Sequence, residues 1–333
     1  MKEALSLIFD RYTLALLGTV VLASLLPCRG QVAEVFGTVT TAAIALLFFL
    51  HGAKLSRDAV IAGLLNWRLH LLVLACTFVL FPLLGLATRS LAAQVVGTQL
   101  ALGVLFLCTL PSTVQSSIAF TSIARGNVPA AVCAASASSL LGIFITPLLV
   151  GLLVHAGGGK AGPAPMAAIQ GVVLQLFVPF VAGQVARRWI GGLVDRNKKV
   201  IGLVDRGSIL LVVYTAFSAA VVAGLWKDVS AQTLAWLLAV CCALLAVALF
   251  VTAQLGKRLG FSREDRITIL FCGSKKSLAS GIPMANVLFS GSAVGAIVLP
   301  LMVFHQIQLM VCAVLAQRYA RQAAATATAG SAA

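Results

Sequence analysis

The chain has 333 residues, of which 60% are hydrophobic and 10% are charged, and its formal net charge is +15 at pH 7. An average soluble domain carries roughly 25% charged residues, so this composition excludes an ordinary soluble globular protein. It does not indicate nucleic-acid binding either, because the basic residues lie between apolar runs, where they orient a membrane protein and contact anionic headgroups.

Apolar runs of about the length that crosses a bilayer follow one another along the whole chain. In chain order they cover residues 11–28, 35–53, 67–88, 97–124, 127–154, 165–186, 207–225, 232–255, 266–289 and 293–317. We therefore predict an all-α integral membrane protein with about ten transmembrane helices. The first run is interpreted as an uncleaved helix, since further apolar runs follow it. Residues 319–333 are expected to form a disordered C-terminal tail.

The basic residues support this count and predict an orientation. With ten spans, 18 Lys and Arg residues fall on the side that holds both termini and 4 fall on the other side. The positive-inside rule then places both termini in the cytoplasm and the protein in the cytoplasmic membrane. All acidic residues lie in predicted connections or at span ends, so no carboxylate is expected in mid-membrane. The cysteines are interpreted as small buried hydrophobic residues, and no metal or cofactor site is predicted.

An odd number of spans on each side of a Gly/Pro-rich link predicts an inverted repeat. Residues 1–155 would form the first repeat, residues 156–164 the linker and residues 165–318 the second repeat. Such 5+5 repeats are a common architecture of transporters that open alternately to the two sides of the membrane.

The fourth and ninth runs are interrupted at corresponding places, so both spans are predicted to be discontinuous. Pro111 in the fourth run removes a backbone donor, and small polar residues follow it. In the ninth run, two lysines lie between glycines and serines where hydrocarbon depth is expected. A charge at that depth costs about 3 kcal/mol on insertion scales, so the pair points to a function. The candidate binding residues of the two runs are Ser112, Thr113, Gln115, Ser116, Ser274, Lys275, Lys276 and Ser277.

Other interpretations of these residues stay open. The ninth span could begin later, which would place both lysines in a cytoplasmic loop. Ser136 and Ser139 of the fifth run are candidates that would also suit tight helix packing. His305 and Gln306 of the tenth run are candidates as well, although a hydrogen-bonded histidine inside the bundle is the simpler interpretation of His305 than a proton-coupling group.

The chain resembles the SBF-like bacterial branch of the bile acid:sodium symporter superfamily. The segments that carry the resemblance are Pro111–Ser117, Phe271–Pro283 and Phe304–Leu309, together with the spacing of the runs. The resemblance implies a panel domain of spans 1, 2, 6 and 7 and a core domain of spans 3–5 and 8–10. It also implies that the broken spans cross near the membrane centre. There the symporters hold sodium, and this chain would place Ser112, Thr113 and Gln115.

The chain departs from the symporters at the sodium site. Cys272 aligns where they place a glutamate, and Lys275 and Lys276 follow it. Without a carboxylate and with two ammonium groups, the site is electrostatically poor for sodium. We therefore expect a lysine ammonium to occupy part of the space that sodium fills in relatives. Its role could be to attract an anionic substrate, to exchange a proton or to tie down the free carbonyls of the broken helices.

Three functions compete. The leading prediction is a secondary transporter for a small organic anion in the lipid bilayer, not an enzyme, with Na⁺ or H⁺ as unproven coupling ions. This prediction expects Lys275 or Lys276 in the lining of a water-reachable cavity. The alternatives are a regulatory membrane protein without transport and an intramembrane hydrolase with a Ser/Lys dyad.

Overall fold

The computed structural model describes residues 11–54, 66–155, 170–171, 173–289 and 293–331, and within these ranges it is helical and contains no strand. The elements are α2 (Arg11–Leu25), α3 (Gly30–Lys54), α5 (Trp67–Ala75), the π-helix η2 (Cys76–Leu80), α6 (Phe81–Val96), α7 (Thr98–Thr109), α8 (Gln115–Ile123), α9 (Val128–His155), the π-helix η3 (Val173–Phe177), α11 (Val178–Arg196), α12 (Lys198–Val222), α13 (Leu225–Asp228), α14 (Ala231–Arg258), α15 (Arg263–Gly273), α16 (Leu278–Leu288) and α17 (Ala293–Ser331).

Apolar side chains cover the outside of these helices as well as the inside. Six helices of the described part are long and apolar enough to cross a membrane. Large hydrophobic residues are exposed along most of them, such as Leu71 on α5, Leu152 on α9 and Phe250 on α14. Lipid accepts such a surface and water does not. The chain is therefore a multi-pass membrane protein.

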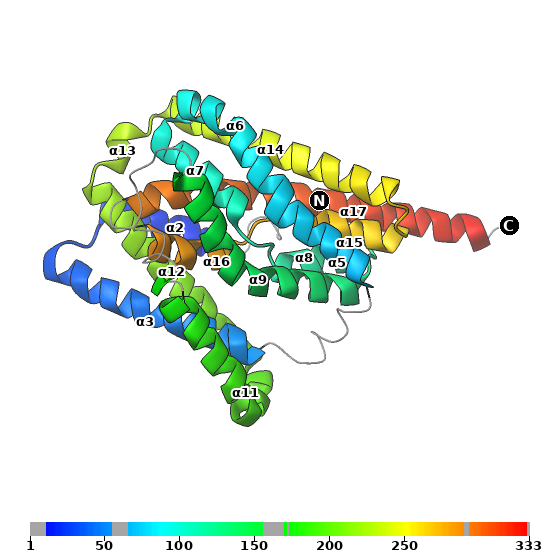
Figure 1. The fold of residues 1–333 in the computed structure, drawn as a ribbon, viewed down its shortest axis with the longest axis horizontal. Coiled ribbons are helices and arrows are strands. Elements are labelled where there is room, and N and C mark those ends of the chain that lie inside the picture. The colour runs from blue at the N-terminus through cyan, green and yellow to red at the C-terminus, as the bar shows by residue number, and fades with distance from the viewer. Residues whose placement is uncertain (1–10, 55–65, 156–169, 172, 290–292, 332–333) are drawn as a thin grey trace.

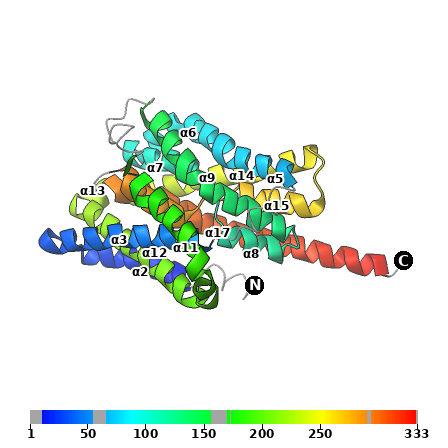
Figure 2. The same ribbon diagram turned by 60° about the horizontal axis from the view of Figure 1, so that its bottom comes forward.

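The helices pack in two groups. One group contains α2, α3, α11 and α12, in which α11 packs against α3, and α12 packs on both α2 and α3 (Figure 1). The other contains α5 to α9 and α14 to α17, with α7 packed between α6 and α17. Figure 2 shows α2, α3, α11 and α12 together along one side of the second group. Helix α12 contacts α16 and α17, so it joins the two groups.

Two predicted boundaries differ from the structure because helix continues into polar sequence. Residues 187–206 were expected to be a connection, but α11 runs to Arg196 and α12 begins at Lys198, with Asn197 between them. Asp205 is therefore not in a connection: it lies in α12 and is 7% exposed. The tail expected to be disordered after residue 318 continues α17 to Ser331, since its sequence is rich in alanine, the strongest helix former.

Two pairs of helices are separated by short non-helical segments. Helix α7 ends at Thr109, because Leu110 is extended and Pro111 has no N–H to continue the hydrogen-bond pattern. Helix α8 begins only at Gln115. Helices α15 and α16 are separated by residues 274–277, and the Ser277 side chain caps α16 by accepting from the Ser280 N–H at 3.2 Å. We call residues 110–114 the first break and residues 274–277 the second break.

Candidate functional site

The two breaks are hydrogen-bonded to each other's surroundings. The Ser277 N–H donates to the Pro111 carbonyl at 2.9 Å. The Ser112 hydroxyl donates to the Cys272 carbonyl at 2.5 Å, and the Ser117 hydroxyl donates to the Phe271 carbonyl at 3.0 Å. Ser112 of the first break and Ser117 of α8 thus bond to carbonyls in the last turn of α15, where helical N–H donors run out, and these bonds align the two breaks.

Lys276 binds three backbone carbonyls from two other stretches of the chain. Its side chain is fully buried, and its ammonium donates to the carbonyls of Thr77 at 2.8 Å, Cys108 at 3.0 Å and Leu110 at 2.7 Å. The ammonium also lies 4.2 Å from the centre of the Phe81 ring. All three N–H donors of the ammonium therefore have an acceptor, and an aromatic face adds a cation–π contact.

Two of these carbonyls are free for an identifiable local reason. The Phe81 N–H bonds to the carbonyl of Cys76, five residues back, as in a π-helix. In the same π-helical pattern, the N–H of residue 82 would bond to the Thr77 carbonyl. Residue 82 is a proline and has no N–H, so the Thr77 carbonyl is left without a backbone donor. The Cys108 carbonyl loses its usual partner because the Ser112 N–H donates to the Ser138 hydroxyl at 3.0 Å.

Lys275 is bound less completely. Its ammonium donates to the Ser116 carbonyl at 2.9 Å and lies 4.1 Å and 5.3 Å from the ring centres of Phe120 and Phe271. One carbonyl and two ring faces thus surround an ammonium that has three donors. Lys275 is fully buried as well.

Helix α17 holds the second break through Gln308. The Lys276 N–H donates to the Gln308 side-chain oxygen, and the Gln308 amide donates to the Lys276 carbonyl, both at 2.9 Å. The same amide lies 2.9 Å from Nδ1 of His305. An amide nitrogen can only donate, so His305 accepts at Nδ1. His305 is thus a hydrogen-bonded residue of the bundle, as the simpler interpretation held.

Of the other predicted site residues, some are hydrogen-bonded within the two breaks, and others are exposed or half-buried. Thr113 hydrogen-bonds to Ser116 at 2.8 Å and to Ser117 at 3.0 Å, and the Ser274 hydroxyl donates to the Leu270 carbonyl at 2.6 Å. Gln115 is exposed, whereas Ser116, Ser136, Ser139 and Gln306 are half-buried. Sequence reasoning did not select Ser138, Ser117, Gln308 or the carbonyl of Thr77 as site groups.

Two expectations about the lysines need correction. The interpretation that puts both lysines in a cytoplasmic loop is wrong, because both are fully buried between α15 and α16. The expectation that one of them lines a water-reachable cavity is also not met, because neither side chain has accessible surface. The reason is the same in both cases: the ammonium groups are turned inward onto backbone carbonyls.

The buried acids are few. Within the described ranges, Asp205 is the one carboxylate among the buried polar and charged side chains, and it pairs with Lys54 rather than with either lysine of the second break. No group of three His, Cys, Asp or Glu side chains in those ranges is arranged to hold a metal ion.

Comparison with known proteins places this arrangement in a family. The chain matches the SBF-like CPA transporter family over residues 10–321. It is 67% identical to an uncharacterized protein of Pseudomonas aeruginosa, covering 94% of this chain and 93% of the relative. It is 58% identical to YfeH of Escherichia coli K12, which is named as a symporter, covering 95% and 94%. It is 30% identical to the sodium/bile acid cotransporter 7 of Danio rerio, covering 84% and 83%. The chain therefore belongs to the SBF-like CPA transporter family and is a membrane transporter, not an enzyme.

Proposed function

We propose that the chain is a secondary transporter for a small organic anion and that it works without sodium. Lys276 carries the proposal: its ammonium occupies a set of three backbone carbonyls at the two breaks. Backbone carbonyls are also ligands that sodium and other hard cations accept. A cation that is part of the chain fills this place permanently, so no dissolved cation is needed to hold the breaks together.

The arrangement of spans in this proposal is the ten-span inverted repeat. Helices α7 and α8 would form one discontinuous span, and α15 and α16 another. The group of α2, α3, α11 and α12 corresponds to the panel domain, and the remaining helices correspond to the core domain. The two helix pairs that are joined through Lys276 then move as one unit within the core, which is the element that alternating access requires to stay rigid.

The substrate would reach the site beside Lys275. Gln115 is exposed and Ser116 is half-buried at the N-terminal end of α8, and the Ser116 carbonyl holds the Lys275 ammonium. The N-terminal end of a helix carries partial positive charge. A small movement that opens this end would present Lys275, a polar amide and free N–H groups to an anion. Lys275 has fewer bonds to break than Lys276, so it is the ammonium that can be exposed.

Uptake into reconstituted vesicles tests the proposal. Radiolabelled organic anions, from small carboxylates to a conjugated bile acid, would be supplied in sodium chloride and in choline chloride. We expect wild-type uptake to be equal in the two salts, Lys275→Met to lose most of it, and Lys257→Met on an exposed stretch of α14 to retain it. Uptake that needs sodium would overturn the proposal.

The hydrolase alternative has less support. In a Ser/Lys dyad the lysine accepts a proton from the serine hydroxyl. Here both ammonium groups donate to carbonyls, and the hydroxyl of Ser274 donates to Leu270 while that of Ser277 caps α16. Neither serine is therefore paired with a base.

A further inference from the structure

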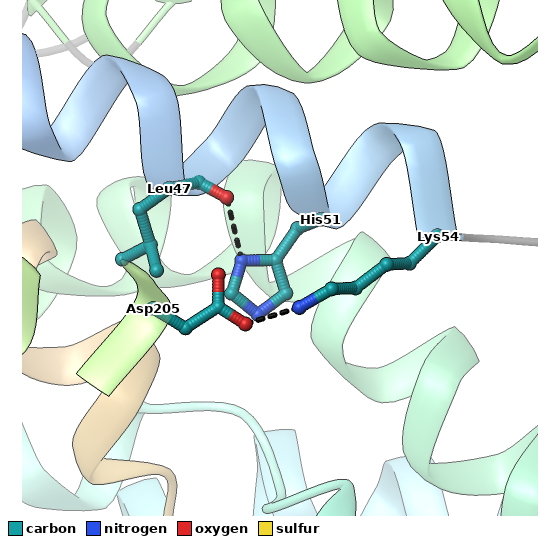
Figure 3. A network of polar contacts seen from close by, with 4 residues as sticks. All are labelled: Leu47, His51, Lys54 and Asp205. Carbon is teal, nitrogen blue, oxygen red and sulfur yellow. Dashed lines mark hydrogen bonds and ion pairs between the residues drawn. The ribbon is translucent and has the colours of Figure 1, made fainter. Parts of the chain in front are cut away.

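A partly buried ionic cluster lies away from the two breaks, between α2, α3 and α12. Asp205 of α12 forms an ion pair with Lys54 at the end of α3, and their side chains are 10% and 33% exposed. His51, one turn before Lys54, lies beside this pair (Figure 3). Sequence reasoning expected Asp205 in a connection and assigned it no role.

The hydrogen bond of His51 fixes which ring nitrogen is free. Nδ1 lies 2.8 Å from the Leu47 carbonyl, which can only accept, so Nδ1 carries the hydrogen. In the neutral ring, Nε2 then has a lone pair and no hydrogen. Figure 3 shows the ring between the Leu47 carbonyl and the Asp205–Lys54 pair, so Nε2 is the nitrogen on the side of that pair.

The carboxylate has an acceptor to spare. Lys54 binds Oδ2 of Asp205, whereas Oδ1 is buried and has no hydrogen-bond partner in the described part of the structure. A buried carboxylate oxygen without a donor is costly. A proton on Nε2 of His51 would create the donor that faces this carboxylate.

Further titratable and charged side chains around His51 come from α2, α11 and α12. The hydroxyl of Tyr12 on α2 is buried, also without a partner in the described ranges, and the Arg206 guanidinium of α12 lies 5.4 Å from the Tyr12 ring centre. From α11, Arg187 donates to the Ala53 carbonyl at 2.6 Å. Of the side chains that the structure describes as buried, Asp205 is the one carboxylate, so the cations named here share this single buried anion.

We propose that His51 and Asp205 form a proton-binding site of this transporter, in which a proton from water binds Nε2 of His51 and is stabilised by the carboxylate of Asp205. The added proton raises the charge of the His51–Lys54–Asp205 set by one. The imidazolium then competes with Lys54 for the carboxylate that links α3 to α12. Because α12 also contacts α16 and α17, occupation of the site alters the contact between the two helix groups.

Proton binding itself does not rest on the proposed function, but its role in coupling does. If the chain transports an organic anion as proposed, proton binding at this site makes H⁺ the coupling ion in place of sodium. If transport is absent, the site would still titrate.

Nuclear magnetic resonance of the full chain, labelled at its histidines and purified in detergent without any solute, tests the site. The chain has four histidines, and His51→Gln identifies the signal of His51. We expect that signal to move during a titration from about pH 8 to about pH 4. In Asp205→Asn the signal should no longer show this titration, and in Lys54→Met it should titrate at higher pH because a competing cation is gone. Asp205→Glu should restore the wild-type behaviour.

Two results would overturn the proposal. One is a His51 signal that does not move over this range in the wild type, and the other is a titration that is unchanged in Asp205→Asn. Both Asp205→Asn and Lys54→Met keep nearly the size of the native side chain, and gel filtration with thermal unfolding would check that each variant is folded. A titrating His51 in a protein that moves no anion would leave the proton site standing and refute the proposed transport alone.

Discussion

Lys276 shows how a buried charge is tolerated without a buried carboxylate. An unpaired ammonium in a low-dielectric interior is strongly unfavourable. The structure compensates with the dipoles of three carbonyls and the face of Phe81 rather than with an anion. In return, the ammonium satisfies backbone acceptors that the breaks and the π-helix leave open.

Replacing this ammonium should therefore cost stability. Lys276→Met leaves the carbonyls of Thr77, Cys108 and Leu110 without a donor, and each unsatisfied buried group costs about 1–3 kcal/mol. Because the variant also removes the cost of burying the charge, we expect the low end, about 3 kcal/mol in all, measured by thermal unfolding in detergent. Lys257→Met is the matched control and should change stability by less than about 0.5 kcal/mol. Equal unfolding temperatures for the two variants would contradict the role assigned to Lys276.

Ser138 and Ser139 provide a second comparison. Ser138 is fully buried and accepts the Ser112 N–H, whereas Ser139 is half-buried on the same helix. Ser138→Ala leaves a buried N–H unpaired and should lower the free energy of unfolding by about 1–2 kcal/mol, while Ser139→Ala should be nearly neutral. Chemical denaturation in mixed micelles would measure both. A larger effect at Ser139 would restore the residue that sequence reasoning had selected.

The residues that sequence could and could not identify differ in a physical way. Lysines and a proline at hydrocarbon depth are visible in a sequence because each violates the composition of a span. Carbonyl acceptors are not visible, because every residue has one. The Thr77 carbonyl became available only through Pro82 and the π-register, and Gln308 was found only because folding brings α17 against the second break.

Among the elements, α3 and α11 approach one another very closely, and glycine makes this possible. A Cβ on Gly52 would lie 2.0 Å from the Phe180 carbonyl oxygen, and one on Gly183 would lie 1.9 Å from that of Phe49. The two contacts are reciprocal along antiparallel helices. Small residues at a crossing let backbones pack closely in membranes.

Gly183→Ala should separate these helices. We expect the overlap to cost about 1–3 kcal/mol of stability despite the better helix propensity of alanine. Gly192 lies on the same helix, and a Cβ added there would meet nothing within 4 Å, so Gly192→Ala should be neutral or stabilising by up to about 1 kcal/mol. Thermal unfolding of Gly183→Ala and Gly192→Ala under the same conditions would measure this difference in stability. A stabilised Gly183→Ala would mean that the helices are not packed at this crossing.

Sequence located the interruptions of the fourth and ninth runs well but misjudged the segment between α11 and α12. Proline and glycine disfavour a continuous helix, and charged residues disfavour the hydrocarbon region, so the sequence marks both interruptions clearly. The α11–α12 segment is polar but has no proline after Pro179, so it extends both helices and carries Asp205 into the protein. Polarity alone therefore did not distinguish a loop from a helix that continues beyond the apolar stretch.

For the whole molecule, the distribution of basic residues makes a prediction about topology that the packing alone does not test. The turn between α2 and α3 carries Cys28 and should lie outside, because few basic residues fall on that side. Asn197, between α11 and α12, should lie in the cytoplasm. Cys28 is half-buried and is the one cysteine near the end of a predicted span, so it is a natural reporter of the outer side.

A membrane-impermeant maleimide applied to intact cells should therefore label the wild type and fail to label Cys28→Ser. Cys242, which is exposed on α14, should stay unlabelled because a thiol facing lipid does not form the reactive thiolate. In the Cys28→Ser background, Asn197→Cys should react only after the membrane is permeabilised. Labelling of Asn197→Cys in intact cells would reverse the orientation, and it would place the Asp205–Lys54–His51 cluster toward the outside. The proton proposed for His51 would then enter from the external solution rather than from the cytosol, so this experiment also fixes the direction of the gradient that the transporter can use.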